Sequence, residues 1–120
     1  PAPACVLIGG ETTVSLEDAF GKGGRNLEFV AAMVAKLGAE LAGVTVLSAG
    51  TDGEDGPTDA AGAVADADTL TALREQNLSA GESVRRHDAY NLFARVGGLI
   101  RTGLTGTNVM DVRVILIHAR

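Results

Sequence analysis

The sequence predicts an α/β domain, with three α/β/α layers, a mixed and largely aliphatic sheet, and helices on both faces. Short apolar runs of strand length alternate along the chain with segments of helical periodicity, which is typical of this class. Hydrophobic residues make up 46% of the chain and aromatic residues only 3%, so the core must consist of Val, Leu, Ile and Ala. A length of 120 residues is the usual size of one domain.

The N-terminal region predicts a buried strand over residues 5–8, an apolar run that ends at two glycines. Residues 12–16 favour a second strand because they include Thr and Val. Since Cys5 lies in the first predicted strand, we expect it to be an inert, buried thiol. As the only cysteine, it excludes an intrachain disulfide and a cysteine-rich metal site.

A helix is predicted over residues 26–37, because Leu27, Val30, Val34 and Leu37 recur on one helical face. Gly38 is typical of the position that follows a helix. Residues 44–47 then predict a buried strand, which runs into a polar, turn-rich loop over residues 51–59.

The second half predicts two helices and two strands. Asp66 or Asp68 is expected to cap the start of a helix that ends near residue 76. Asp88 is expected to cap a second helix over residues 89–96. Residues 99–102 and 112–117 are the predicted strands, with a Gly/Thr turn over 105–108 between them.

Composition excludes several classes of function. The net charge is −5 and no segment concentrates Lys or Arg, which disfavours nucleic-acid binding. No apolar stretch approaches the length of a membrane span, and no secretory signal is evident, so we expect no membrane association and a cytoplasmic location. Because the chain starts with Pro1 instead of Met, we expect it to be processed or cut from a longer polypeptide.

Glycines at 21, 23 and 24 run straight into the predicted helix, followed by Arg25 and Asn26. Free amides at a helix N-terminus attract anions, and a guanidinium matches a carboxylate or phosphate. A flexible turn with a surface arginine is an equally good interpretation. The segment is neither a Walker A loop nor a Rossmann fingerprint.

Two further loops carry polar side chains. One loop contains Asp52, Asp55 and Asp59, whose carboxylates fit a Mg²⁺ ion or substrate hydroxyls. Asp-Gly and Pro-Thr-Asp are also ordinary turn formers, and the spacing alone favours this second interpretation. Residues 102–108 fit either an anion cradle or a plain turn between strands. Glu11 stands at a strand end, whereas His87 and His118 show no ligand pattern and are expected to be structural or surface residues.

Taken together, the loops resemble the MOFRL domain, which forms the C-terminal part of class II glycerate kinases (glycerate 2-kinases), many of which carry the name hydroxypyruvate reductase. The similarity spans nearly the whole chain. It rests on four collinear motifs: Gly9-Gly10-Glu11-Thr12-Thr13-Val14; Gly23-Gly24-Arg25-Asn26-x-Glu28-Phe29; Ser48-Ala49-Gly50-Thr51-Asp52-Gly53-x-Asp55-Gly56-Pro57-Thr58-Asp59-Ala60-Ala61-Gly62; and Thr102-Gly103-x-Thr105-Gly106-Thr107-Asn108-Val109-x-Asp111.

Three positions depart from the family pattern. Leu27 replaces a usual glutamine, which removes an amide from the neighbourhood of the predicted anion site. Leu104 replaces a usual proline and Met110 a usual asparagine, and both changes affect the stiffness of a loop more than its chemistry.

The resemblance implies that ATP phosphorylates the 2-hydroxyl of D-glycerate with Mg²⁺, in a cleft shared with an N-terminal Rossmann-like domain that these 120 residues lack. Arg25 and Asp52 would be catalytic, and Asp52 and Asp55 would hold the metal. The residues implied in binding substrate or phosphate are Glu11, Asn26, Thr51, Asp55, Thr105, Thr107 and Asn108.

Two other functions remain open at this point. One is hydroxypyruvate reduction, although no G-x-G-x-x-G segment between a strand and a helix indicates a nicotinamide site. The other is a non-catalytic domain that binds small anions. On the kinase interpretation, the 120-residue chain alone should fold but lack turnover.

Overall fold

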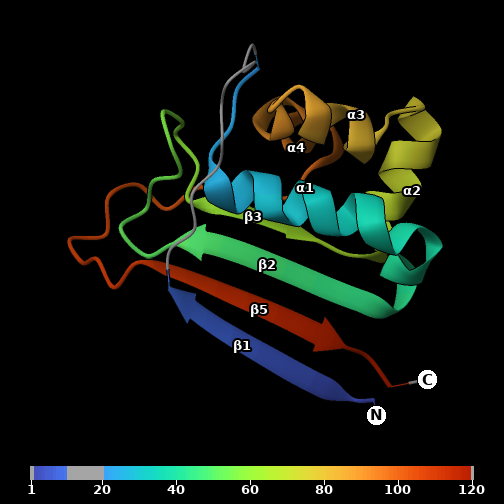
Figure 1. Cartoon of the computed structure of the whole chain (residues 1–120), viewed down its shortest axis with the longest axis horizontal. Coiled ribbons are helices and arrows are strands. Elements are labelled where there is room, and N and C mark those ends of the chain that lie inside the picture. Colours follow the sequence, from blue (N-terminus) through green and yellow to red (C-terminus); the bar gives the residue numbers. More distant parts are fainter. Residues whose placement is uncertain (1, 11–20, 120) are drawn as a thin grey trace.

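The computed structural model describes residues 2–10 and 21–119, which form one sheet with helices packed on it (Figure 1). The strands are β1 (Ala4–Gly10), β2 (Val44–Gly50), β3 (Gly62–Ala65), β4 (Leu99–Ile100) and β5 (Asp111–Ile117). The helices are α1 (Arg25–Leu37), the 3₁₀ helix η1 (Gly38–Gly43), α2 (Ala67–Gln76), α3 (Ala80–Arg85) and α4 (Ala89–Val96).

Most predicted elements are confirmed within a few residues, and three were missed. The strand β3 was not predicted because Gly62-Ala63-Val64-Ala65 is short and contains no bulky residue. The short helices η1 and α3 were also missed, since neither is long enough to show a helical period. The strand predicted over residues 12–16 lies outside the described residues.

The α/β class is confirmed, but each strand pairing in the described ranges is antiparallel, so the sheet is not mixed. The strand order is β1-β5-β2-β3-β4. β1 and β2 do run parallel to each other, but β5 lies between them and runs antiparallel to both. A loop instead of a helix joins β2 to β3, which allows these neighbours to pair antiparallel.

The helices in the described part of the chain lie on one face of the sheet, not on both as predicted (Figure 1). α1 packs against β2 and β3, while α2, α3 and α4 extend the same layer. None of these helices is long and apolar enough to cross a bilayer. The predicted α/β/α arrangement has a second layer of helices on the other face of the sheet, and the described residues do not contribute it.

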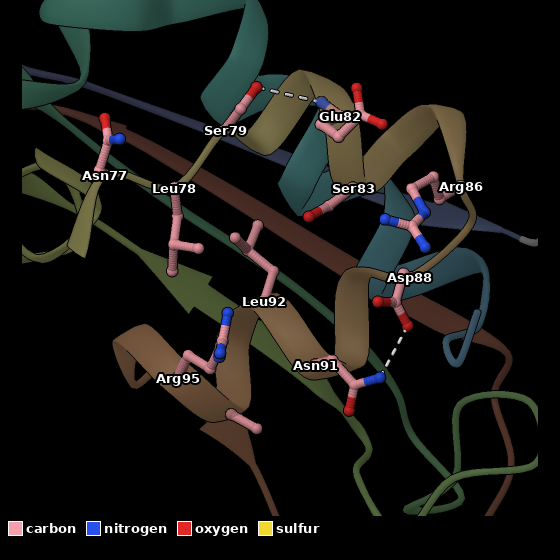
Figure 2. Close-up of a pocket in the computed structure, with 11 residues that line it drawn as sticks. Asn77, Leu78, Ser79, Glu82, Ser83, Arg86, Asp88, Asn91, Leu92 and Arg95 are labelled. Carbon is pink, nitrogen blue, oxygen red and sulfur yellow. Dashed lines mark hydrogen bonds between the residues drawn. The ribbon is translucent and has the colours of Figure 1, made fainter.

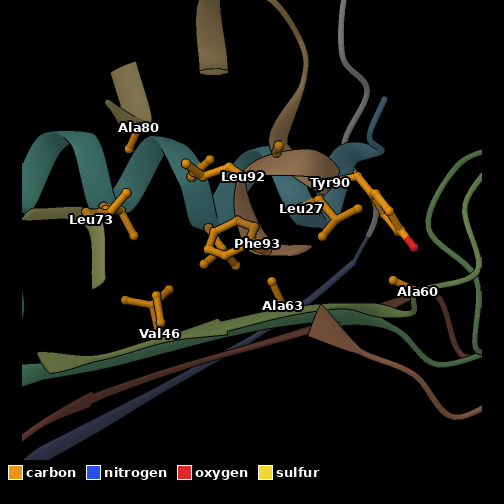
Figure 3. Packing of buried hydrophobic residues seen from close by; sticks show 14 of the residues in the cluster. Leu27, Val46, Ala60, Ala63, Leu73, Ala80, Tyr90, Leu92 and Phe93 are labelled. Atoms are coloured by element: carbon orange, nitrogen blue, oxygen red, sulfur yellow. The ribbon is translucent and has the colours of Figure 1, made fainter. Parts of the chain in front are cut away.

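The core lies between the sheet and this helical layer (Figure 3). Phe93 of α4 is the largest of its fully buried side chains. The rest is mainly aliphatic, as the composition predicts, and the fully buried members include Leu27, Val30, Ala31, Leu41, Val46, Ala60, Ala63 and Ala65. Burial of one face of α1 against β2 and β3 fixes the position of its N-terminus, where the predicted anion site begins.

The expectation of a buried Cys5 is wrong, because the thiol is exposed. β1 is an edge strand of the sheet, with β5 on one side only. Its residues are exposed almost throughout. The prediction took the continuous apolar run of residues 5–8 as a sign of a strand covered on both faces. In this structure the faces of β1 are not covered.

Candidate functional site

Three loops meet at one end of the sheet: residues 21–24 before α1, residues 51–61 after β2, and residues 101–110 before β5 (Figure 1). Gly50, the last residue of β2, pairs with Asp111, the first residue of β5. A Cβ atom on Gly24 would lie 2.6 Å from Asp55 atoms, so glycine is required for the first two loops to touch. The sequence elements predicted to bind ligand therefore share one edge.

Asp55 caps α1 from 29 residues away in the sequence. Its Oδ1 accepts the backbone N–H of Asn26 at 2.9 Å, and its Oδ2 accepts the backbone N–H of Leu27 at 2.7 Å. The residue at the usual capping position is Gly24, which has no side chain to do this. Because both carboxylate oxygens are used and the residue is fully buried, its geometry favours holding the helix over holding a metal.

Asn26 links this cap to the sheet. Its Nδ2 donates to Asp55 and to Asp111 Oδ1, both at 3.1 Å, while its Oδ1 accepts the Ser48 hydroxyl at 2.6 Å. Asn26 and Ser48 are fully buried and Asp111 is almost so. No buried side-chain polar atom of the described residues lacks a hydrogen-bond partner. A satisfied network of this kind is rigid, since each group holds its neighbour in one orientation.

Arg25 forms a two-pronged ion pair with Asp111, with Nε to Oδ2 at 2.7 Å and Nη2 to Oδ1 at 2.9 Å. The sequence interpretation gave this fork to a ligand anion, whereas two of its donors bind a carboxylate of the same chain. About a quarter of the Arg25 side chain is still exposed (27%), so it faces the surface of the loop cluster. We call the set Arg25, Asn26, Ser48, Asp55 and Asp111 the buried network.

Burial raises the pKa of the Asp55 carboxyl above its ordinary value. The hydrogen bonds from the Leu27 and Asn26 amides and the nearby Arg25 act in the opposite direction, but loss of hydration dominates. The helix amides therefore replace part of the water that this carboxyl loses on burial, but not all of its effect.

The second group of predicted site residues joins the loops after β2 and before β5. Thr51 Oγ1 donates to the Met110 carbonyl and accepts the Val109 N–H, both at 2.8 Å. Thr105 Oγ1 donates to the Thr51 carbonyl at 2.6 Å, and its N–H donates to the Asp52 carbonyl at 3.2 Å. These bonds fix the two loops against each other.

Within the described part of the chain, the remaining side chains of this group make only local hydrogen bonds. Asp52 Oδ1 accepts the Glu54 N–H at 3.0 Å, a turn bond within its own loop. Thr107 is exposed and its N–H donates to Thr105 Oγ1 at 3.3 Å, while Asn108 Oδ1 accepts the Met110 N–H at 2.9 Å. We call Thr51, Asp52, Thr105, Thr107 and Asn108 the open loop pair.

Glu11 lies outside the described residues. The other predicted site residues gather at one edge of the sheet but fall into two environments, the buried network and the open loop pair. Within the described ranges, no three His, Cys, Asp or Glu side chains converge as a metal site would require. Asp52 fits Mg²⁺ as a single carboxylate, which this ion accepts when substrate phosphates complete its shell.

Sequence reasoning gave no role to Asp111, although this residue closes the last of the four motifs. It also missed a cluster beside the site. The Tyr90 hydroxyl donates to Asp59 at 2.6 Å, Arg101 donates to both of them, and the Lys22 ammonium lies 4.0 Å from the Tyr90 ring centroid. The Tyr90 hydrogen bond, followed by the charge of Arg101, lowers the pKa of Asp59. No spacing rule connects these four positions, so only the fold reveals them.

An open pocket of about 650 Å³ lies elsewhere, among α3, α4 and the segment before α3 (Figure 2). Its lining combines cationic, acidic and apolar side chains, including Arg86, Arg95, Asp88 and Leu92. It contains none of the predicted site residues. The chemistry indicated by the motifs is therefore on the loops and not in this pocket. His87 is structural, as expected, since its Nδ1 lies 2.6 Å from Glu28.

Comparison with known proteins agrees with this arrangement. The MOFRL family model matches residues 4–111. A mouse glycerate kinase is 44% identical over 97% of this chain, and a Pyrococcus horikoshii glycerate 2-kinase is 38% identical over 98%. A protein of Agrobacterium vitis, provisionally named hydroxypyruvate reductase, is 45% identical over 97%. The chain spans about a quarter of the length of these relatives, from 23% to 26%.

Solved structures share the fold. A glycerate kinase from Thermotoga maritima superposes with a TM-score of 0.88 at 41% identity, covering 97% of this chain and 28% of that one. A Pyrococcus horikoshii protein gives a TM-score of 0.90 at 37% identity, over 99% of this chain and 27% of that one. With the family model matching most of its length, this chain belongs to the MOFRL family.

Proposed function

We propose that this chain is the C-terminal domain of a glycerate 2-kinase, which transfers the γ-phosphoryl group of ATP to the 2-hydroxyl of D-glycerate. The observation that carries the proposal is the gathering of three family motifs, those of residues 23–29, 48–62 and 102–111, at one sheet edge in a chain whose relatives bear the name glycerate kinase. The chain matches only a quarter of those relatives, so the active site would be completed by an N-terminal domain in the same polypeptide.

In this proposal the open loop pair faces the substrates. The glycerate 2-hydroxyl oxygen attacks the γ-phosphorus, the bond from this phosphorus to the β,γ-bridging oxygen breaks, ADP leaves, and the hydroxyl proton is released to solvent. Thr107 and Asn108 are exposed and offer donors to phosphate or glycerate oxygens. Mg²⁺, when bound, would neutralise charge on the phosphates. Asp52 is its carboxylate ligand in this domain.

Arg25 would stabilise the negative charge on the phosphoryl group as it moves. Its pairing with Asp111 fixes the plane of the guanidinium, and the partial exposure leaves it reachable from the loop surface. Asp55 and Asn26 would then act as positioning residues, because they fix the helix end from which Arg25 projects.

The test is a coupled assay of ADP release from the longer polypeptide with ATP, D-glycerate and Mg²⁺, with phosphorus NMR to distinguish 2- from 3-phosphoglycerate. We expect 2-phosphoglycerate from the longer polypeptide and no turnover from the 120-residue chain. Turnover by the 120-residue chain above a matched blank would show that no second domain is needed. A longer polypeptide without turnover would contradict the kinase proposal.

Hydroxypyruvate reduction is the second candidate, because the Agrobacterium vitis relative carries that name. The same preparation would be assayed for oxidation of NADH or NADPH in the presence of hydroxypyruvate. Reduction without phosphorylation would replace the kinase assignment. A third outcome, binding of D-glycerate or phosphate with neither reaction, would indicate a non-catalytic domain that binds anions.

A further inference from the structure

The face of the sheet opposite the helices is apolar and open. Residues directly opposite each other on paired strands share a face, so the register defines rows across the sheet. One row joins Leu7 of β1, Val114 of β5, Leu47 of β2 and Val64 of β3. These residues alternate with the inward-facing ones, such as the fully buried Val46.

Neighbouring rows continue the same surface. One of these rows consists of Cys5, Leu116 and Thr45. The other contains Gly9, Val112 and Ala49. Leu7 is 71% exposed, and Val112 and Leu116 are also exposed. No charged side chain stands in these rows. We call these ten residues the open face: Cys5, Leu7, Gly9, Thr45, Leu47, Ala49, Val64, Val112, Val114 and Leu116.

A face of this kind is unusual for the surface of a domain. Soluble proteins rarely leave contiguous apolar patches of more than a few hundred Å² uncovered. The edge strand β1 also has no charged residue and no proline, the usual protections of an exposed edge. The exposed apolar residues of the face point to a cover over this side of the sheet, and the unprotected edge shows that β1 has no defence of its own against further contacts.

We propose that the open face is covered by a helical layer supplied by the same polypeptide, from the part that lies outside these 120 residues. In the relatives about three quarters of the chain lies outside the matched region, which provides ample length. The face spans four strands at about 4.8 Å spacing, and a helix with its side chains is roughly 10 Å wide. Two amphipathic helices would therefore be wide enough to cover it.

Cys5 provides a direct probe, since its thiol belongs to the open face. The rate of maleimide labelling of Cys5 would be measured in the longer polypeptide by peptide mass spectrometry, in native buffer and in denaturant. We expect labelling at least tenfold slower in the native protein. Equal rates in the two conditions would overturn the proposal. Protection that disappears on dilution would also overturn it, because that result identifies a second copy as the cover.

A charge on the same surface gives an independent readout. Leu7→Glu in the longer polypeptide should lower the melting temperature by several degrees, because it places a carboxylate beneath the proposed helices. Ala35→Glu, on the exposed side of α1, is the matched control and should leave it nearly unchanged. Equal melting temperatures for the two variants would contradict the cover. Neither measurement uses turnover, so both stand apart from the kinase proposal.

Discussion

Asp52 and Asp55 lie three residues apart in one loop, and their surroundings differ completely. Asp55 is fully enclosed, with both oxygens bound to the first amides of α1. Asp52 is half-buried, and its carboxylate accepts a local turn bond from the Glu54 N–H. Within one motif, a carboxylate that builds the site is therefore adjacent to one that is open to ligand, and sequence similarity alone does not separate these two roles.

Arg25 lies between the buried and the open environment, because it pairs with buried Asp111 while part of its side chain stays exposed. Its substitution therefore shows which environment matters for its role. In the longer polypeptide, Arg25→Ala should lower kcat by on the order of a thousandfold, as for arginines that stabilise a transferred phosphoryl group. Arg25→Lys should be nearly as damaging, since an ammonium does not reproduce the planar fork. Steady-state kinetics of both variants measure this.

Thermal melts of the same two proteins are the control. Variants with wild-type kcat and a lowered melting temperature would assign Arg25 to the buried network alone. Variants with both wild-type kcat and wild-type stability would show that Arg25 contributes neither to phosphoryl transfer nor to the buried network.

Asp55→Asn should destabilise the 120-residue chain by about 3 kcal/mol, because an amide nitrogen then faces donors and leaves a buried N–H unsatisfied. Urea denaturation followed by circular dichroism measures the change. Asp52→Asn is the matched variant in the same loop and should stay within about 0.5 kcal/mol of wild type. Equal effects from the two substitutions would remove the distinction between buried and open carboxylates.

Asp52→Asn should instead act on catalysis in the longer polypeptide. We expect turnover to fall and the Mg²⁺ concentration for half-maximal rate to rise about tenfold, because a ligand charge is lost. A Mg²⁺ titration at saturating ATP and D-glycerate measures both quantities. An unchanged titration curve would show that Asp52 is a turn former only.

The smallest expected effect concerns pH. Because the pKa of Asp55 is raised on folding, the native state binds a proton more tightly than the unfolded state. The stability from this group is thus fully present below its ordinary pKa and is lost as pH rises through the raised value. The difference in unfolding free energy between wild type and Asp55→Asn should widen as pH is lowered from neutral toward 4. A difference that narrows would mean that the helix amides outweigh desolvation.

The sequence predicted the helices and strands that show a long apolar period, such as α1 and β5, and it predicted which loops carry candidate site residues, but not that these loops meet at one edge. It did not predict the sheet order, because the apolar pattern of residues 111–117 indicates a strand but not which strands are its neighbours. In the structure this strand lies between β1 and β2. The sequence also did not predict that Asp55 would cap α1, since this contact depends on tertiary structure and Asp-Gly turns are common. Glu11 and the proposed metal role of Asp52 stay predictions.

The cap on α1 has a consequence for the order of folding. α1 begins at a glycine without a side-chain cap, and the residues that fix its first turn lie at positions 55 and 111. During synthesis α1 is made before either partner, so we expect its N-terminal turn to be weakly held until residues 55 and 111 pack against it. Contacts between such distant positions slow folding, because a long loop must close before they form. We therefore expect the first turn of α1 to become fully ordered only when β5 has paired with the sheet and brought Asp111 beside it.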